Sequence, residues 1–262
     1  DHCRIRVNHG KLVAWRASGG AAPPDIRALD SATHAVWRSD APREDNGVLV
    51  LGSPIGTDEF VAAETARRAE AEELLLQAIS TVESTQAAWL LLYYCAVPRS
   101  NYLLRTVPPG QLHTYATARD DNVLACLCRL LNVSPPADRA AAWVRQAMLP
   151  VRYGGLGLRN SFRTAPAAYW ASIADTLHPL SQRYPAIAEA MCANLDNGAA
   201  GAAANLREAV VVAQTLDHAG MIERPEWRAL LGGARPPQPT AITHGEWVHG
   251  WQYYGSDACE HL

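Results

Sequence analysis

Residues 57–79 have the sequence TDEFVAAETARRAEAEELLLQAI, and they mark the point at which the character of the chain changes. Thr57 is a favourable N-cap, and Asp58 and Glu59 follow it in the first turn. The remaining residues are mostly Ala, Glu, Arg and Leu, which favour a helix, and the acidic side chains stabilise its positive N-terminal end. The pattern predicts a helix from Thr57 to about Ile79.

Downstream of this stretch the same composition continues, interrupted by Pro- and Gly-containing breaks. Such breaks end helices, because proline lacks the amide donor and glycine tolerates the backbone angles of a turn. We therefore expect a mainly α fold. The predicted helices are residues 83–96, 110–131, 137–148, 160–177, 185–195, 203–218 and 223–231, followed by a Gly/Pro linker at 232–239.

The stretch before residue 57 differs in pattern. Residues 3–16 alternate apolar and polar around Asn8–Gly10, which predicts two short strands and a tight turn. Val48–Leu51 is a third apolar run, and the glycines and proline of Gly52–Gly56 predict a sharp turn after it. The expected organisation is a small α+β part at 1–57, a helical domain at 58–196, and a helical extension with an aromatic tail at 197–262.

Composition excludes some classes of protein. The 262 residues are 48% hydrophobic and 19% charged, and the net charge of -3 excludes a uniformly basic protein that coats nucleic acid. The apolar run at 87–97 is shorter than the roughly 20 residues of a membrane-spanning helix. The six cysteines form no Cys-x-x-Cys pair. We expect a soluble protein with no membrane partner, in a reducing intracellular compartment, cytoplasmic or nuclear.

Charge is concentrated in one segment. Residues 95–165 contain nine arginines and three acidic residues, a local balance of +6, with tyrosines interleaved. Such a segment can follow a phosphate backbone and stack on bases or sugars. The alternative is ordinary surface arginines whose stems cover apolar surface. The nine are Arg99, Arg105, Arg119, Arg129, Arg139, Arg145, Arg152, Arg159 and Arg163.

Motifs for a self-contained active site are missing. Asp120 and Asp121 lie within a predicted helix rather than on a hairpin, so we expect solvated acids on the helix surface. Cys126 and Cys128 are two residues apart, which directs them away from each other on a helix and favours burial over zinc binding. The tail sequence HGEWVH at 244–249 lacks metalloprotease spacing, and we predict no metal site even with Cys259 and His261 nearby.

Four segments, taken in order, resemble the downstream half of a reverse transcriptase from non-long-terminal-repeat retrotransposon-like elements. The resemblance covers roughly residues 3–196. The segments are VNHGKLVAW at 7–15, VLVLGSPIG at 48–56, WLLLYYCAVPRSNYLLR at 89–105, and LPVRYGGLGLR at 149–159 with AAYWAS at 167–172.

The resemblance implies a palm remnant followed by a thumb-like helical domain. Lys11 would lie near the incoming triphosphate and stabilise the charge of the leaving pyrophosphate. Leu51, Gly52 and Ser53 would form the primer-grip loop. The thumb-side residues that contact the phosphates and sugars of the template–primer would be Arg99, Asn101, Tyr102 and Arg105.

The family's catalytic aspartates would precede Asp1, in the missing N-terminal catalytic part of the same polyprotein. Two-metal phosphoryl transfer needs those carboxylates, so the resemblance implies magnesium for the complete polymerase, and no cofactor or polymerase activity for this chain alone. The expected partner is RNA or an RNA/DNA template–primer. Two alternatives stay open: a helical protein-interaction scaffold that docks partners through Trp247, Trp251, Tyr253 and Tyr254, and the nonfunctional product of a decayed element.

Overall fold

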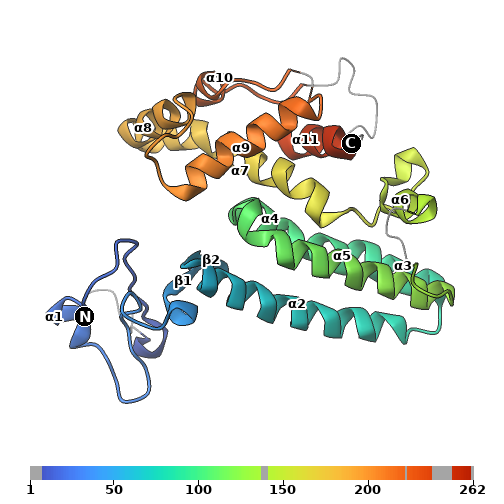
Figure 1. Cartoon of the computed structure of the whole chain (residues 1–262), viewed down its shortest axis with the longest axis horizontal. Helices are drawn as coiled ribbons and strands as arrows, with labels where there is room; N and C mark the ends of the chain where they lie inside the picture. Colours follow the sequence, from blue (N-terminus) through green and yellow to red (C-terminus); the bar gives the residue numbers. More distant parts are fainter. Residues whose placement is uncertain (1–7, 137–140, 222, 238–249, 261–262) are drawn as a thin grey trace, which may run out of the picture. The chain divides into compact units, whose positions relative to one another are not determined.

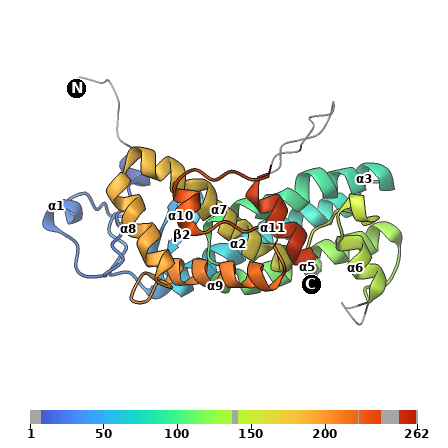
Figure 2. The ribbon, with the colours of Figure 1, turned by 90° about the horizontal axis from the view of Figure 1, so that it is seen from above.

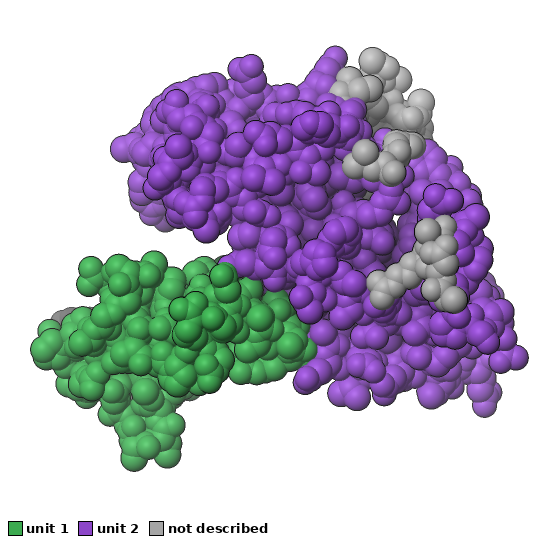
Figure 3. All heavy atoms as spheres, in the orientation of Figure 1, with its two compact units in different colours: residues 1–68 green, residues 69–262 purple. Residues whose placement is uncertain are grey.

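The computed structural model describes residues 8–136, 141–221, 223–237 and 250–260 (Figure 1). The chain forms two compact units, which Figure 3 colours separately: residues 1–68 and residues 69–262. The division falls inside the long helix α2 (Asp58–Ser80), which the sequence predicted at 57–79. The mainly helical fold class is confirmed, whereas the assignment to palm and thumb stays a prediction.

The first unit is built around a small β-hairpin. Strand β1 (Gly47–Val50) pairs antiparallel with β2 (Ser53–Gly56), so that Val50 lies opposite Ser53. The two residues between the strands, Leu51 and Gly52, both have positive φ, at 50° and 86°. Positive φ at both positions is typical of a type I′ turn, whose twist matches that of paired strands. The predicted turn at Gly52–Gly56 is therefore mostly strand, and the chain reverses at residues 51–52.

The predicted strand pair at residues 3–16 is wrong for its described part. His9–Lys11 form a single 3-10 turn, η1, and Ala14 makes only an isolated bridge to Trp37. The Asn8 side chain accepts a hydrogen bond from the Gly10 amide at 3.1 Å, which favours a turn over strand pairing. Residues 3–7 of the predicted pair lie outside the described residues.

Helices make up the second unit, together with the end of α2, and Figures 1 and 2 show α11 alongside α7. They are α3 (Thr85–Leu91), π-turn η3 (Leu92–Ala96), 3-10 turn η4 (Val97–Ser100), α4 (Asn101–Thr106), α5 (Pro109–Leu131), α6 (Ala142–Met148), 3-10 turn η5 (Val151–Tyr153), α7 (Ser161–Arg183), α8 (Pro185–Asp196), α9 (Ala204–His218), α10 (Trp227–Leu231) and α11 (Trp251–Glu260). The first unit also has α1 (Pro24–Arg27) and 3-10 turn η2 (Arg43–Asp45).

Two apolar clusters form the core of this unit. One surrounds α7, where Trp170 is fully buried and packs edge to face on Trp251 of α11, with ring centroids 5.8 Å apart. The other joins α2, α3, η3 and α5 through side chains such as Leu76, Leu92 and Leu127. The first cluster holds α7 and α11 together, and α4 packs on α7, so these helices surround the candidate site.

Proline accounts for one predicted helix end and contradicts another. The helix predicted at 83–96 comprises α3 and η3 and ends at Ala96 as expected, because Pro98 in η4 has no amide to continue the α-helical hydrogen bonds. Pro179, predicted as a break, lies inside α7. Pro179 and Asp175, whose carbonyl loses its helical donor, are both exposed, so water can satisfy that carbonyl.

The remaining helices start and end close to the predicted residues, with α10 shorter than the predicted 223–231 and residues 137–140 outside the description. Within the described residues, none of the helices is both long and apolar enough to cross a membrane.

Candidate nucleic-acid interface

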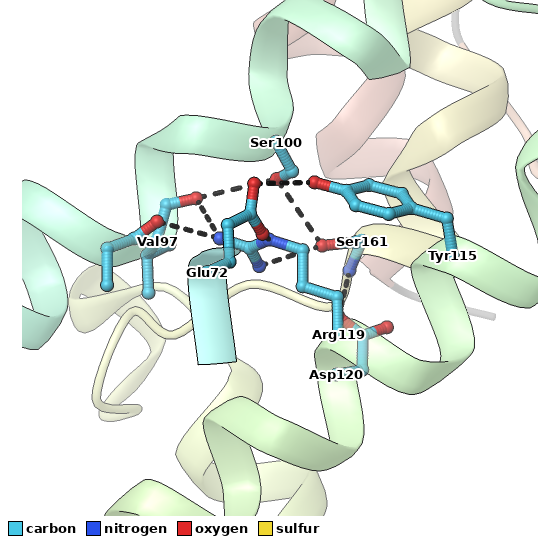
Figure 4. A network of polar contacts seen from close by, with 8 residues as sticks. Glu72, Val97, Ser100, Tyr115, Arg119, Asp120 and Ser161 are labelled. Carbon is cyan, nitrogen blue, oxygen red and sulfur yellow. Dashed lines mark hydrogen bonds and ion pairs between the residues drawn. The ribbon is translucent and has the colours of Figure 1, made fainter. Parts of the chain in front are cut away.

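Arg119 of α5 is buried in a polar network rather than displayed on the surface. Figure 4 shows its guanidinium among groups from four segments, and only 3% of the residue is exposed. Nε donates to Glu72 of α2 at 3.1 Å, and Nη1 donates to the Ser161 hydroxyl at 3.1 Å. Nη2 donates to the carbonyls of Ala96 and Val97 at 2.8 and 2.9 Å.

The sequence explains why those two carbonyls are available. They lie where the π-turn before Pro98 passes into a 3-10 turn, so the regular α-helical pairing is lost there. An arginine has five donors and satisfies several acceptors at once. The Tyr115 hydroxyl donates to the other Glu72 oxygen at 2.8 Å, which completes the pairing of that carboxylate (Figure 4).

The prediction that Asp120 is a solvated acid on the helix surface is wrong. It is only 8% exposed, and its carboxylate accepts hydrogen bonds from the backbone amides of Ser161 at 2.8 Å and Phe162 at 3.0 Å. Asp120 therefore satisfies two amides in the first turn of α7, which also gain from a negative charge. Burial raises the pKa of Asp120, and the two amide donors and Arg119 oppose that rise. Cys126 and Cys128 are buried, as predicted.

Two more arginines of the basic segment form ion pairs within the unit. Arg105 of α4 pairs with Asp175 of α7 at 2.8 Å and donates to Gln252 of α11 at 3.0 Å. Arg152 of η5 pairs with Asp257 of α11. Its guanidinium also lies 4.7 and 4.5 Å from the ring centres of Tyr153 and Tyr253, so its charge and its flat face are both engaged.

Four arginines of the segment have no ion-pair or hydrogen-bonding side-chain partner in the part of the chain that the structure describes: Arg99, Arg145, Arg159 and Arg163. Arg99 and Arg159 are exposed. Arg129 donates to the Ser80 hydroxyl at 2.9 Å, and Arg139 lies outside the described residues.

A polar cavity of about 260 Å³ gathers residues that are far apart in the sequence. Asn101 comes from α4, Arg152 and Arg159 come from the loop before α7, and α11 supplies one side. The α11 residues that line it are Gln252, Tyr253, Ser256, Asp257 and Glu260. The Ser256 hydroxyl is buried and has no hydrogen-bond partner among the described residues, so the cavity holds an unused polar group.

Two of the four predicted thumb residues lie at this cavity, and the other two are exposed elsewhere. Asn101 borders this cavity, and Arg105, one turn further along α4, donates to Gln252 of the same cavity wall. Arg99 in η4 and Tyr102 in α4 are exposed but do not line it. Sequence reasoning counted Arg152 and Arg159 in the basic segment without selecting them. The signal that singles them out is their place in the Gly-rich stretch 149–159.

The glycines of that stretch hold the loop in place. Gly157 has φ of +69°, and a Cβ there would lie 2.4 Å from the Tyr93 ring. Leu158, its neighbour, is fully buried in the core. The loop therefore requires glycine at position 157 to place Arg152 and Arg159 on either side of a buried anchor.

Within the first unit, Lys11 lines a separate cavity of about 410 Å³ with Arg38 and Arg67. Two acids, Asp45 and Glu64, also line it, and Glu64 pairs with Arg67. Lys11 is exposed and has no side-chain partner among the described residues. Sequence reasoning missed Arg38 and Arg67, which no motif marks.

The predicted primer-grip residues lie at the hairpin tip. Leu51 is 92% exposed, whereas Ser53 is buried. The Gly52 carbonyl accepts a hydrogen bond from Arg68 of α2. The structure thus places an apolar side chain at the tip of a turn whose Gly52 carbonyl is bound by the Arg68 side chain.

In the tail, Trp251 is 5% exposed and belongs to the core, while the Tyr254 hydroxyl donates to the Pro237 carbonyl at 2.9 Å. Trp251 is therefore not available as a docking residue. Trp247, His244, His249 and His261 lie outside the described residues. Comparisons of the chain with protein-family models, curated proteins and solved structures found no match.

Proposed function

We propose that the helical unit binds the sugar-phosphate backbone of a nucleic acid, as the thumb side of a retroelement reverse transcriptase would bind its template–primer. The observation that carries the proposal is the convergence of Asn101, Arg152 and Arg159 with Tyr253 on one polar cavity. Arg159 supplies charge-assisted contacts to phosphate, and Asn101 and Tyr253 supply hydrogen bonding and stacking.

Arg159 is the principal phosphate contact in this proposal. It is exposed and makes no ion pair with any described residue. Arg99 is a second contact of the same kind. Arg105 and Arg152, which are committed to Asp175 and Asp257, position the cavity wall rather than bind phosphate.

The first unit has a complementary role in the proposal. Lys11, with Arg38 beside it on the same cavity, supplies positive charge for the phosphates of an incoming nucleotide. The exposed Leu51 at the hairpin tip contacts the primer strand as a grip loop. In this proposal, as the resemblance implies, the catalytic carboxylates and the magnesium of the complete polymerase come from an N-terminal catalytic part of the same polyprotein. No polymerase step is assigned to this chain.

Fluorescence anisotropy with a labelled RNA/DNA hybrid tests the proposal on the full chain. Arg159→Ala and Arg99→Ala are each expected to weaken binding several-fold, because each removes a phosphate contact. Arg207→Ala on α9 is the matched control, because Arg207 is an exposed arginine outside the basic segment that donates to the Ala202 carbonyl. Its affinity should equal that of the wild type.

Two results would overturn the proposal. Wild-type protein without measurable affinity for the hybrid would remove nucleic-acid binding altogether. Equal losses in all three variants would show that only net charge matters and that Arg99 and Arg159 form no site.

A further inference from the structure

A second, larger cavity in the helical unit has an apolar character. It measures about 630 Å³ and lies where the starts of α5 and α7 meet α9 and α11. The lining residues that matter here are His113 and Ala116 of α5, Phe162, Arg163 and Ala165 of α7, and Cys259 of α11. The volume falls in the range of roughly 300–1,000 Å³ typical of small-molecule sites.

Small side chains explain why the cavity is open. Ala116, Ala165 and Cys259 are buried, and none is long enough to reach across the space between the helices. Phe162 forms one wall, and its ring meets His113 edge to face with centroids 5.0 Å apart. An apolar cavity of this kind offers water few hydrogen bonds and favours an apolar guest.

One cationic side chain borders this apolar space without a partner of its own. Arg163 makes no ion pair with any described residue, unlike Arg105, Arg119 and Arg152 of the same segment. Arg163 and Cys259 line the same cavity. Burial raises the pKa of the Cys259 thiol to about 11, and the Arg163 charge opposes that rise.

One acid beside the cavity lining is already used. Glu208 of α9 accepts a hydrogen bond from the Gly110 amide at 2.9 Å. The Thr215 hydroxyl donates to the Val211 carbonyl at 3.0 Å. The polar chemistry left for a guest is therefore the Arg163 guanidinium and the His113 ring.

We propose that this cavity binds a small molecule that has an apolar aliphatic or aromatic body and one carboxylate. The body packs among Ala116, Ala165 and Phe162, and the carboxylate pairs with Arg163. This inference is independent of the proposed nucleic-acid interface, which uses other residues.

Isothermal titration calorimetry of the full chain with three probes tests it. Octanoate has the apolar body and the charge, octan-1-ol has only the body, and acetate has only the charge. We expect octanoate to bind saturably at one site and about tenfold more tightly than octan-1-ol, with no measurable binding of acetate, because the charged hydrogen bond adds to apolar burial.

Variants locate the site. Arg163→Gln should reduce the affinity for octanoate to that for octan-1-ol, whereas Arg145→Gln, at another unpaired arginine, should change neither. Ala165→Leu should abolish binding of both probes by filling the cavity. Phe162→Ala, at a half-exposed wall residue that can be changed without disturbing the core, should weaken both several-fold.

Three results would overturn the proposal: no saturable octanoate binding to the wild type, equal affinity for octanoate and octan-1-ol, or an undiminished preference for octanoate in Arg163→Gln. Unchanged affinity in Phe162→Ala would place any bound octanoate elsewhere and also overturn it.

Discussion

Arg119 and Arg159 belong to the same basic segment, but their surroundings differ completely. Arg119 is buried and donates to a carboxylate, a hydroxyl and two backbone carbonyls. Arg159 is exposed at the edge of a polar cavity and has no partner in the described chain. A count of charges along the sequence treats them alike, whereas the fold uses the first to hold helices together and leaves the second exposed and without a partner among the described residues.

Replacing Arg119 is expected to cause the largest loss of stability among the changes considered for this segment. Arg119→Met keeps much of the apolar stem but leaves the partly buried Glu72 without its cation. Breaking a buried pair costs about 3–5 kcal/mol, and urea denaturation should show a loss of that size in the free energy of unfolding. The double variant Arg119→Met/Glu72→Leu should recover part of it. A single variant as stable as the wild type would contradict the structural role of Arg119.

Asp120 gives a second test in the same region, because its contribution to the free energy of unfolding depends on pH. Asp120→Asn replaces an acceptor of two amides, and we expect a loss of about 1–3 kcal/mol near neutral pH. Burial raises the pKa of Asp120 in the folded state above its ordinary value. Between those two pKa values the folded state binds more protons than the unfolded state, so lowering the pH through that window favours folding.

The measurement is urea denaturation of wild type and Asp120→Asn over the acidic range. The difference in unfolding free energy between them should widen as the pH falls through the window. A difference that narrows would show that the amide donors, rather than burial, dominate the pKa of Asp120.

Gly157 tests how the exposed region is held. Gly157→Ala requires a side chain at φ of +69°, which costs about 1–2 kcal/mol, and its Cβ would meet the Tyr93 ring. We expect a loss of at least that size in thermal or urea unfolding, together with weaker binding of the hybrid. Gly198→Ala, at a similar φ with open space around the Cβ, is the control for backbone strain alone. Equal losses of unfolding free energy in the two variants would show that the contact between the Cβ and the Tyr93 ring has no effect on stability.

Arg159 gives the smallest expected change in stability. Arg159→Gln should alter the free energy of unfolding by no more than about 0.5 kcal/mol, because exposed substitutions without partners have little effect. The same variant should bind the hybrid less tightly. A large loss of stability would mean that Arg159 is structural, and the contrast with Arg119 would disappear.

Local signals predicted much of the fold. The N-terminal signal at Thr57 and the Pro and Gly breaks placed α2, α5, α8 and α9 close to their observed bounds. The features that were predicted wrongly depend on contacts between residues far apart in the sequence. Nothing near Asp120 indicates that its acceptors serve the amides of residues 161 and 162, forty positions away. Asn101 was selected by resemblance, whereas Arg152 and Arg159 could be recognised only once α4 and α11 were seen to pack on α7 and to line the same cavity.

The salt dependence of binding to an RNA/DNA hybrid tests the central claim most directly. We expect the logarithm of the wild-type affinity to fall steeply with the logarithm of salt concentration, with a slope of about -0.9 for each phosphate neutralised. The double variant Arg99→Ala/Arg159→Ala should have a slope shallower by the equivalent of about two phosphates. Identical slopes for wild type and double variant would contradict the claim that these arginines form the phosphate-binding surface.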